Sequence, residues 1–287
     1  VEIYDKETRQ MLTATEMAGN DSSIQTTNLY LGKGNYIAKV SSGNYYSGDA
    51  YRLLVNYSKM DNIEREPNDS QKTATMISIN KEIQGSFGTS GDIDYYKFTL
   101  YSDSIVKPSF EFMPGNTNSK TFVVSIHDKN QKLYSMNIGG KENQKNLSPI
   151  VLSKGTYIVK LENPRFNGDE YKLNIKSTAI DNAEVEPNDT LSQSTVLRTD
   201  TEISGVLSTE VDVDYYKLIV DETSNAKLAL RFDKQESRSS AFIITIEQNG
   251  KTAWKANAKW NEGVLEQEFQ FEPGEYYIKV APSTWDD

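Results

Sequence analysis

Asn62–Asp69 (NIEREPND) and Asp92–Lys97 (DIDYYK) are a pair of motifs that the chain contains twice. Both return about 120 residues later with the same spacing, as Asn182–Asp189 (NAEVEPND) and Asp212–Lys217 (DVDYYK). A repeat of this length matches an ordinary domain, since domains of about 100–150 residues are the most common. The repeated motifs therefore set the domain boundaries.

A third motif marks the second half of each repeat. It begins an alternating segment after a turn at Gly34–Ile37 (GNYI), Gly155–Ile158 (GTYI) and Gly274–Tyr277 (GEYY). Gly48–Tyr51 (GDAY) and Gly168–Tyr171 (GDEY) then introduce a closing strand in the first two copies only. The sequence thus predicts the C-terminal half of a module at residues 1–59, a complete module at 61–178, and at 181–287 a module that lacks its last strand.

Four segments of the complete module alternate apolar with polar residues, as strands with one face on a core do: Tyr95–Leu100, Phe122–Ile126, Tyr157–Leu161 and Tyr171–Ile175. Turns rich in Gly, Asn, Asp and Pro separate them, and the 17 Tyr and 10 Phe of the chain suit strands. We expect an all-β fold of tandem jelly-roll-like β-sandwich modules. Only the segment after each Pro-Asn-Asp, such as Ser70–Ile77, is expected to form a short helix, capped there by Asp69 or Ser70.

The composition argues against some classes of binding partner. The 31 basic and 41 acidic residues give a formal net charge of -10, which repels nucleic acids and anionic membranes. The chain has no cysteine, and no stretch approaches the roughly 18 apolar residues of a membrane span. No signal segment opens the sequence, so an exported protein would have lost it already.

The first motif concentrates oxygen ligands. Glu64, Glu66, Asn68 and Asp69 lie within six residues. Of the two aspartates in the second motif, Asp94 is expected to face this cluster, because it borders the aromatic strand. A hard cation such as calcium takes six to eight oxygens of these types. The residues alone also permit a second interpretation, in which Pro-Asn-Asp is a capped turn and the glutamates are solvated.

In order and at domain spacing, the motifs Glu-x-Glu-Pro-Asn-Asp, Asp-x-Asp-Tyr-Tyr and Gly-x-Tyr resemble those of bacterial pre-peptidase C-terminal (PPC) domains, a family that includes the collagen-binding domains of clostridial collagenases. The resemblance implies a secreted or cell-surface protein with a jelly-roll sandwich and with calcium bound between the linker at the domain start and the first sheet. Its implied ligands are Glu64, Glu66, Asn68, Asp69 and Asp94 in one module, and Glu184, Glu186, Asn188, Asp189 and Asp214 in the next.

Two departures from the family pattern bear on function. Gly91 and Val211 stand where the collagenase version often carries a further acidic residue, which predicts weaker binding or a water ligand. Collagen binding in those relatives uses exposed aromatic residues around the Gly-x-Tyr segment, and only the third copy has two tyrosines there, Tyr276 and Tyr277. Inward packing with the hydroxyl at the rim is the alternative role for such tyrosines.

Catalysis has little support in the sequence. His127 is the only histidine, and no Gly-x-Ser-x-Gly pattern provides a nucleophile for it. Paired carboxylates could serve a glycosidase, but this acidic motif is duplicated together with its scaffold, as expected for a structural site in each module.

Two hypotheses on function follow. The first is a non-catalytic, calcium-stabilised array that binds an extracellular matrix or cell-wall polymer and is attached to an upstream catalytic domain, such as a peptidase, in a longer parent protein. The second is a spacer or a secretion and processing segment with no ligand beyond the ion. An exposed aromatic patch on a sheet face is expected only for the first.

Overall fold

The computed structural model describes residues 1–18, 21–26, 28–43, 48, 50–89, 91–112, 120–139, 144–163 and 170–283. The fold is all-β, as predicted, and the described residues contain one helical segment, the 3₁₀ turn Leu191–Gln193. No described helix is long and apolar enough to cross a membrane. Asp49, Gly168 and Asp169 of the closing-strand motifs lie outside the described residues.

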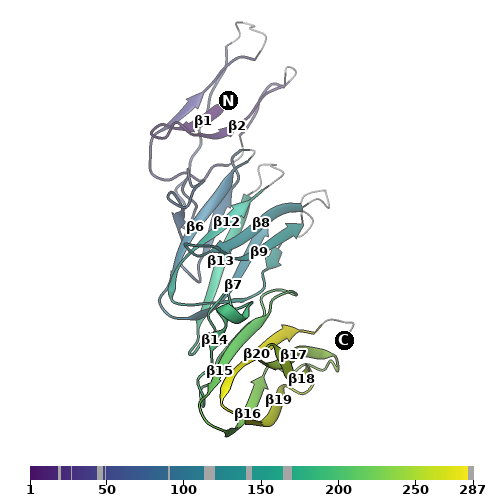
Figure 1. Ribbon diagram of the computed structural model, residues 1–287. Coiled ribbons are helices and arrows are strands. Elements are labelled where there is room, and N and C mark those ends of the chain that lie inside the picture. Colours follow the sequence, from purple (N-terminus) through teal and green to yellow (C-terminus); the bar gives the residue numbers. More distant parts are fainter. Residues whose placement is uncertain are drawn as a thin grey trace. The chain divides into compact units, whose positions relative to one another are not determined.

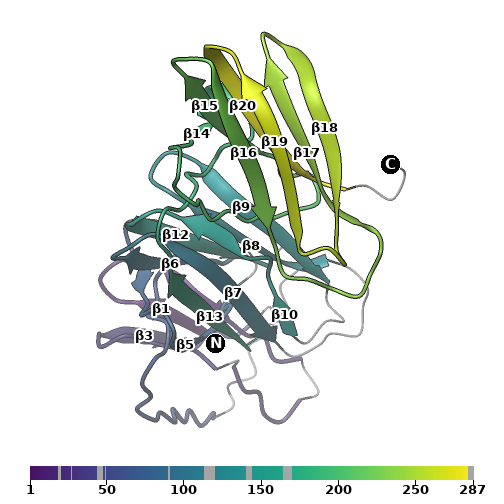
Figure 2. The same ribbon diagram turned by 90° about the horizontal axis from the view of Figure 1, so that it is seen from below.

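The middle module consists of two sheets (Figure 2). One has the order β10 (Gln144–Asn146), β7 (Ser104–Phe112), β13 (Glu170–Ala179), β5 (Glu82–Ser86), with β11 (Ile150–Leu152) also paired to β7. The other has the order β4 (Thr75–Met76), β6 (Ile93–Leu100), β12 (Gly155–Glu162), β8 (Lys120–His127), β9 (Lys132–Gly139). The four strands expected from alternation lie within β6, β8, β12 and β13.

An aromatic core fills the space between these sheets. Tyr96, Phe98 and Leu100 of β6 alternate with more exposed neighbours and are 0 to 1% exposed. Phe110 of β7 meets Phe122 of β8 edge-on, with ring centroids 5.0 Å apart. Burying each such side chain contributes about 1.5–3 kcal/mol, so this core accounts for much of the stability of the module.

The N-terminal segment forms a three-stranded sheet with the order β2 (Met11–Ala14), β1 (Glu2–Asp5), β3 (Tyr36–Lys39) (Figure 1). This order repeats β9-β8-β12 of the middle module. The hairpin turns match as well, since Asp5 Oδ1 accepts the backbone N–H of Glu7 at 3.0 Å, just as Asp128 Oδ1 accepts that of Asn130 at 2.7 Å.

The closing strand predicted after Gly48 is wrong for this first copy. Residues 50–60 are assigned to no strand, and Tyr51 and Val55 are 72% and 69% exposed. The physical reason is the lack of partners: β13, the equivalent strand, pairs with β7 and β5, and the described part of residues 1–59 contains no counterpart of either strand.

The C-terminal module repeats the second sheet of the middle module. Its five strands have the order β14 (Thr195–Val196), β15 (Asp214–Val220), β20 (Gly274–Pro282), β17 (Ser240–Gln248), β18 (Lys251–Lys259). The opposing layer contains β16 (Ser224–Arg231) and β19 (Val264–Phe271), which pair with each other. Phe271 and Tyr276 pack in its core with ring centroids 4.7 Å apart.

The helix expected after the first Pro-Asn-Asp, at Ser70–Ile77, is also wrong, whereas the segment after the second contains the 3₁₀ turn Leu191–Gln193. Thr75–Met76 forms the short strand β4, parallel to β6, with Thr75 buried and Met76 64% exposed. Ser70 and Thr73 instead close a turn, in which their hydroxyl oxygens lie 2.8 Å apart. Such local side-chain bonds compete with a helix, and Thr75 gains more by packing in the sheet.

Candidate metal centres

Backbone hydrogen bonds bring the two acidic motifs together. The N–H of Glu64 donates to Gln84 O at 2.8 Å, so the first motif runs beside β5. The Glu66–Pro67 peptide bond is cis, as is Glu186–Pro187 in the second copy. The N–H of Tyr95 donates to Asn68 O at 3.0 Å, which fixes the start of β6 against the first motif.

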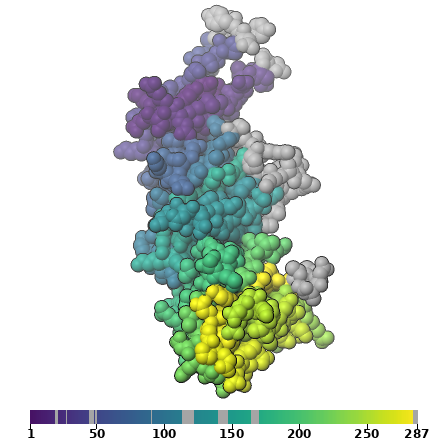
Figure 3. Space-filling view, in the orientation of Figure 1, coloured from purple at the N-terminus to yellow at the C-terminus, as the bar shows by residue number. Residues whose placement is uncertain are grey.

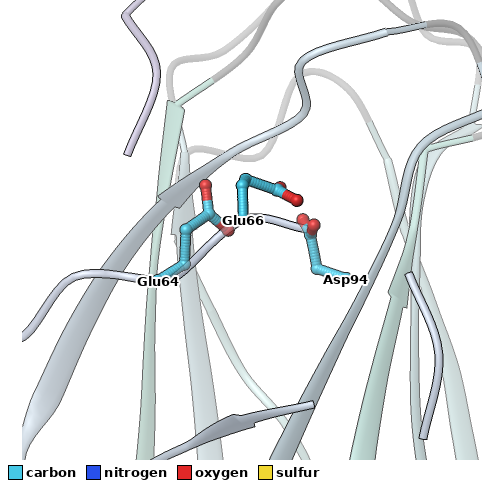
Figure 4. Close-up of side chains that lie close together, drawn as sticks. All are labelled: Glu64, Glu66 and Asp94. Carbon is cyan, nitrogen blue, oxygen red and sulfur yellow. The ribbon is translucent and has the colours of Figure 1, made fainter. Parts of the chain in front are cut away.

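Three carboxylates converge at this junction. Carboxylate oxygens of Glu64, Glu66 and Asp94 all lie within 4.8 Å of one another, and the side chains point toward a common centre (Figure 4). Glu64 and Asp94 are fully buried, and Glu66 is 9% exposed. Such a group could hold a metal ion.

Hydrogen bonds hold Glu64 in place from both sheets. Its Oε1 accepts the backbone N–H of Ser86 at 2.6 Å. Its Oε2 accepts the hydroxyl groups of Tyr96 on β6 and Tyr171 on β13, both at 3.0 Å. The Tyr171 hydroxyl also lies 2.5 Å from Asp94 Oδ2, so one tyrosine binds two of the three acids.

Several buried side-chain oxygens of the two motifs have no hydrogen-bond partner. Within the described part of the chain these are Glu66 Oε1, Asn68 Oδ1 and Asp94 Oδ1. A buried polar atom without a partner costs free energy, and a buried charge costs more. A cation coordinated by these oxygens would remove that cost. Because every available ligand atom is an oxygen, the donor set fits a hard cation.

The electrostatics agree with this interpretation. Burial, reinforced for Glu66 by the charge of Glu64, raises the pKa of Glu64 to about 8 and that of Glu66 to about 9. Burial and the same neighbouring carboxylates raise the pKa of Asp94 well above its ordinary value. A bound cation would lower these pKa values, because an opposite charge nearby favours the ionised carboxylate.

Asp69 and Asp92 lie next to the three clustered acids and hydrogen-bond to each other. Asp92 Oδ2 accepts the backbone N–H of Gly88 at 2.5 Å. The Asp92 carboxyl also shares a hydrogen bond with Asp69, which in turn accepts one from Gln10 of the N-terminal segment. Burial raises the pKa of Asp92 to about 7. Asp92 continues the alternation of β6, because residues at i and i+2 of an extended segment lie on the same face, so the expectation that Asp94 alone of the two aspartates faces inward is wrong.

The C-terminal module reproduces the centre. Oxygens of Glu184, Glu186 and Asp214 lie within 4.8 Å of one another. Glu184 Oε2 accepts the hydroxyl of Tyr216 at 2.7 Å and the amide of Asn188 at 3.1 Å. Among the described residues, Asn188 Oδ1 and Asp214 Oδ1 have no hydrogen-bond partner.

Burial again raises the pKa values in this second centre. The pKa of Glu186 rises to about 8, and that of Asp214 to about 10, with Glu184 as the main neighbouring charge. Asp189 is exposed and hydrogen-bonds to Asp212, so it occupies the same position as Asp69.

The tyrosines that support the carboxylates were not predicted from the sequence. Tyr96 and Tyr216 belong to the repeated Asp-Tyr-Tyr motif, and Tyr171 to the Gly-Asp-x-Tyr motif. The recurrence of both motifs was the available signal. Pairing a tyrosine with an acid more than 100 residues away requires the fold.

The tyrosine pair of the third copy is divided between two faces. Tyr276 is 5% exposed, and its hydroxyl donates to Glu272 O at 3.0 Å. Tyr277 points the other way and is partly exposed, with Lys217 Nζ 6.0 Å from its ring centroid. Only Tyr277 is therefore accessible on the outer face of β20.

No family model and no curated protein matches the sequence. Similar solved structures include the pre-peptidase C-terminal domain of a collagenase from Bacillus anthracis (20% identity, 39% of this chain and 100% of that one, TM-score 0.30). They also include the M60 catalytic domain with the CBM51-1 and CBM51-2 domains of Clostridium perfringens ZmpB (6% identity, 71% and 32%, TM-score 0.27). At these values the likeness assigns neither a family nor a function.

Proposed function

We propose that the chain is a non-catalytic array of secreted β-sandwich modules of the PPC type, stabilised by calcium and able to bind an extracellular polymer. The observation that carries the proposal is the duplicated buried cluster, Glu64, Glu66 and Asp94 in one module and Glu184, Glu186 and Asp214 in the other. Each cluster has the same scaffold and the same oxygen-only donors.

Calcium fits better than other common metals. Zinc sites use histidine or cysteine, and the chain has one histidine and no cysteine. Magnesium needs near-ideal octahedral geometry and keeps several waters, whereas calcium accepts irregular sets of carboxylate and amide oxygens. In each centre the two glutamates, the aspartate and the asparagine would hold the ion, which would supply charge neutralisation.

A structural role suits these centres better than catalysis. Glu64 and Asp94 are fully buried, so a substrate has no direct access to their carboxylates. A centre between the start of a module and its second sheet would stabilise the fold by mass action, because only the folded chain presents all the ligands.

The test is calcium titration of the full chain by calorimetry at fixed ionic strength. We expect two ions per chain, one in Asp94→Asn or Asp214→Asn, and none in the double variant. At a free calcium concentration of 100 times the Kd, binding adds about 2.7 kcal/mol to stability relative to excess chelator.

Asp61→Asn is the matched control, since it makes the same charge change at an exposed position of the same module. It should leave the stoichiometry at two. Absence of binding heat, or a double variant that still binds two ions, would refute the metal assignment.

The polymer-binding part of the proposal rests on the outer face of β15 and β20. Tyr215 lies opposite Lys279, and Lys217 opposite Tyr277, with each lysine Nζ 5.8 to 6.0 Å from the partner ring centroid. In Figure 3 the yellow strand β20 is visible at the surface. Flat aromatic rings alternating with cations suit a polar, extended polymer.

Co-sedimentation with insoluble collagen and with purified bacterial cell wall tests this face. Tyr215→Ala with Tyr277→Ala should weaken binding to the recognised polymer at least tenfold. Tyr101→Ala, at a tyrosine that is 79% exposed in the middle module, should not. Binding to neither polymer would favour the alternative role, a spacer or a secretion and processing segment with calcium as its one ligand.

A further inference from the structure

One row of side chains crosses the outer face of the five-stranded sheet in the C-terminal module. Tyr215 of β15 lies opposite Lys279 of β20, and Lys279 Nζ is 5.8 Å from the ring centroid of Tyr215. Lys279 in turn lies opposite Thr245 of β17, and Thr245 lies opposite Lys255 of β18. Thr245 is 8% exposed, with a long lysine side chain on either side of it in the row. The row therefore combines an aromatic ring, ammonium groups and a sheltered hydroxyl on one surface.

The middle module carries the same row on the outer face of its own five-stranded sheet. Lys160 of β12 lies opposite Ser125 of β8, and its Nζ is 6.0 Å from the ring centroid of Tyr95 on β6. Ser125 is 3% exposed, so its hydroxyl is sheltered as that of Thr245 is. Aligning the Asp-Tyr-Tyr and Gly-x-Tyr motifs matches Tyr95 with Tyr215 and Lys160 with Lys279. The row thus belongs to the repeated unit, as the acidic centre does.

Several lysines of these two outer faces have no carboxylate partner. The ion pairs on the faces join Lys160 to Glu162 at 2.8 Å and Lys217 to Glu275 at 2.7 Å. Within the described part of the chain, two lysines on each face form no ion pair: Lys97 and Lys132 in the middle module, Lys255 and Lys279 in the C-terminal module. Local positive charge therefore lies on both faces, although the formal net charge of the chain is -10.

One position distinguishes the two faces. His127 of β8 lies opposite Lys132, and burial together with the charges of Lys160 and Lys132 lowers the pKa of His127. Asp128 follows it in the hairpin turn, where its carboxylate accepts backbone N–H groups of the turn. The counterpart of His127 on β17 is Glu247, a partly exposed carboxylate on the C-terminal face. The middle face should therefore attract anionic groups more strongly than the C-terminal face.

We propose, as an extension that rests on the polymer binding argued above, that both outer faces bind a linear anionic polysaccharide. Ammonium groups without carboxylate partners attract its acidic groups, and the adjacent tyrosine ring offers a flat amphipathic surface to its sugar rings. Duplex nucleic acid carries one charge per about 1.7 Å and is repelled by the net charge of the chain. A polysaccharide with acidic groups one or more sugar rings apart meets much less repulsion. Two faces on one chain raise the affinity for such a repeating polymer.

Native electrophoresis of the full chain through gels that contain a soluble polymer tests this assignment. Carboxymethylcellulose should retard the chain, and hydroxyethylcellulose, which has the same backbone without the charge, should leave its mobility unchanged. Raising the salt concentration from about 0.05 to about 0.5 M should abolish the retardation, because salt screens exposed charges. Free calcium is kept constant throughout, so that the acidic centres stay in one state.

Paired substitutions locate the binding on each face. Lys97→Gln with Lys132→Gln should weaken binding to carboxymethylcellulose about tenfold or more, because one of the two faces is lost. Lys255→Gln with Lys279→Gln should have a smaller effect, and the fourfold variant should show no retardation. Replacing the same four lysines by arginine keeps the charge and should preserve binding.

The matched control is Lys107→Gln with Lys176→Gln, which removes two positive charges from exposed positions on the opposite sheet of the middle module. It should leave the retardation unchanged. An equal loss in this control, or a chain that carboxymethylcellulose does not retard, would overturn the assignment. If the chain co-sediments with collagen or cell wall without any retardation by the polyanion, the proposed polymer binding stands and the anionic class is wrong. If it binds no polymer at all, both are refuted.

Discussion

Replacing Tyr171 by phenylalanine removes one hydroxyl group and keeps the ring. The ring packs against Phe87 and Phe110, with centroids 5.1 and 5.3 Å apart, and those contacts persist in the variant. The hydroxyl contacts Glu64 Oε2 at 3.0 Å and Asp94 Oδ2 at 2.5 Å. The substitution therefore isolates the hydrogen bonds from the packing.

The expected loss follows from the single proton of that hydroxyl, which can be donated to one acid at a time. Both acids are fully buried, where water cannot replace the tyrosine, and a buried polar group left without its partner costs about 1–3 kcal/mol. We therefore expect a loss of about 2 kcal/mol for the middle module. For a domain of this size that corresponds to a fall in Tm of roughly 8 °C.

Two spectroscopic signals separate the modules. All three tryptophans lie between residues 181 and 287, so their fluorescence reports on the C-terminal module, whereas far-ultraviolet circular dichroism reports on every strand. In excess chelator, Tyr171→Phe should lower the circular-dichroism transition that tryptophan fluorescence does not report, and leave the fluorescence midpoint nearly unchanged. Tyr95→Phe, at a partly exposed tyrosine on the outer face of β6, is the control. A loss below about 0.5 kcal/mol, equal to that of the control, would refute the role assigned to the hydroxyl.

Two further predictions concern the same centre. Without a cation, the free energy of unfolding should fall as pH rises from about 4.5 to 9. The folded-state pKa values of Glu64 and Glu66, about 8 and 9, lie above the ordinary value of 4.5. The folded chain therefore binds more protons than the unfolded chain in this window, and raising the pH favours unfolding. Denaturant unfolding at several pH values measures this slope, and a slope of opposite sign would contradict it; saturating calcium should flatten it. Gly85→Ala should cost about 1–3 kcal/mol, because a Cβ there would lie 2.5 Å from the Tyr171 hydroxyl oxygen. Gly139→Ala, where a Cβ meets nothing within 4 Å, should be nearly neutral in the same melts.

The sequence predicted the fold class well because strand alternation and the repeat are local signals that the structure retains. It predicted the closing strand of the first copy wrongly, because alternation shows that Tyr51–Tyr57 is able to pair and a strand also needs partners. The helix at Ser70–Ile77 failed for a related reason. A cap and a short run of helix formers were outweighed by pairing of Thr75 with β6.

The ligands of the acidic centre were predictable from the sequence, whereas the tyrosine that hydrogen-bonds to them was not. Glu64, Glu66 and Asp94 come from two motifs that are close in sequence and joined by a backbone hydrogen bond. Tyr171, which binds two of them, lies 107 residues after Glu64 and arrives only when β13 closes the sheet. No local pattern reports a contact of that sequence separation.

The contribution of β13 links the packing of the core to the chemistry of the site. Closing the sheet covers the core with Leu173 and Ile175 and at the same time gives Asp94 a hydroxyl partner. Anything that orders the acids before an ion binds lowers the cost of binding, so strand closure and calcium binding should strengthen each other.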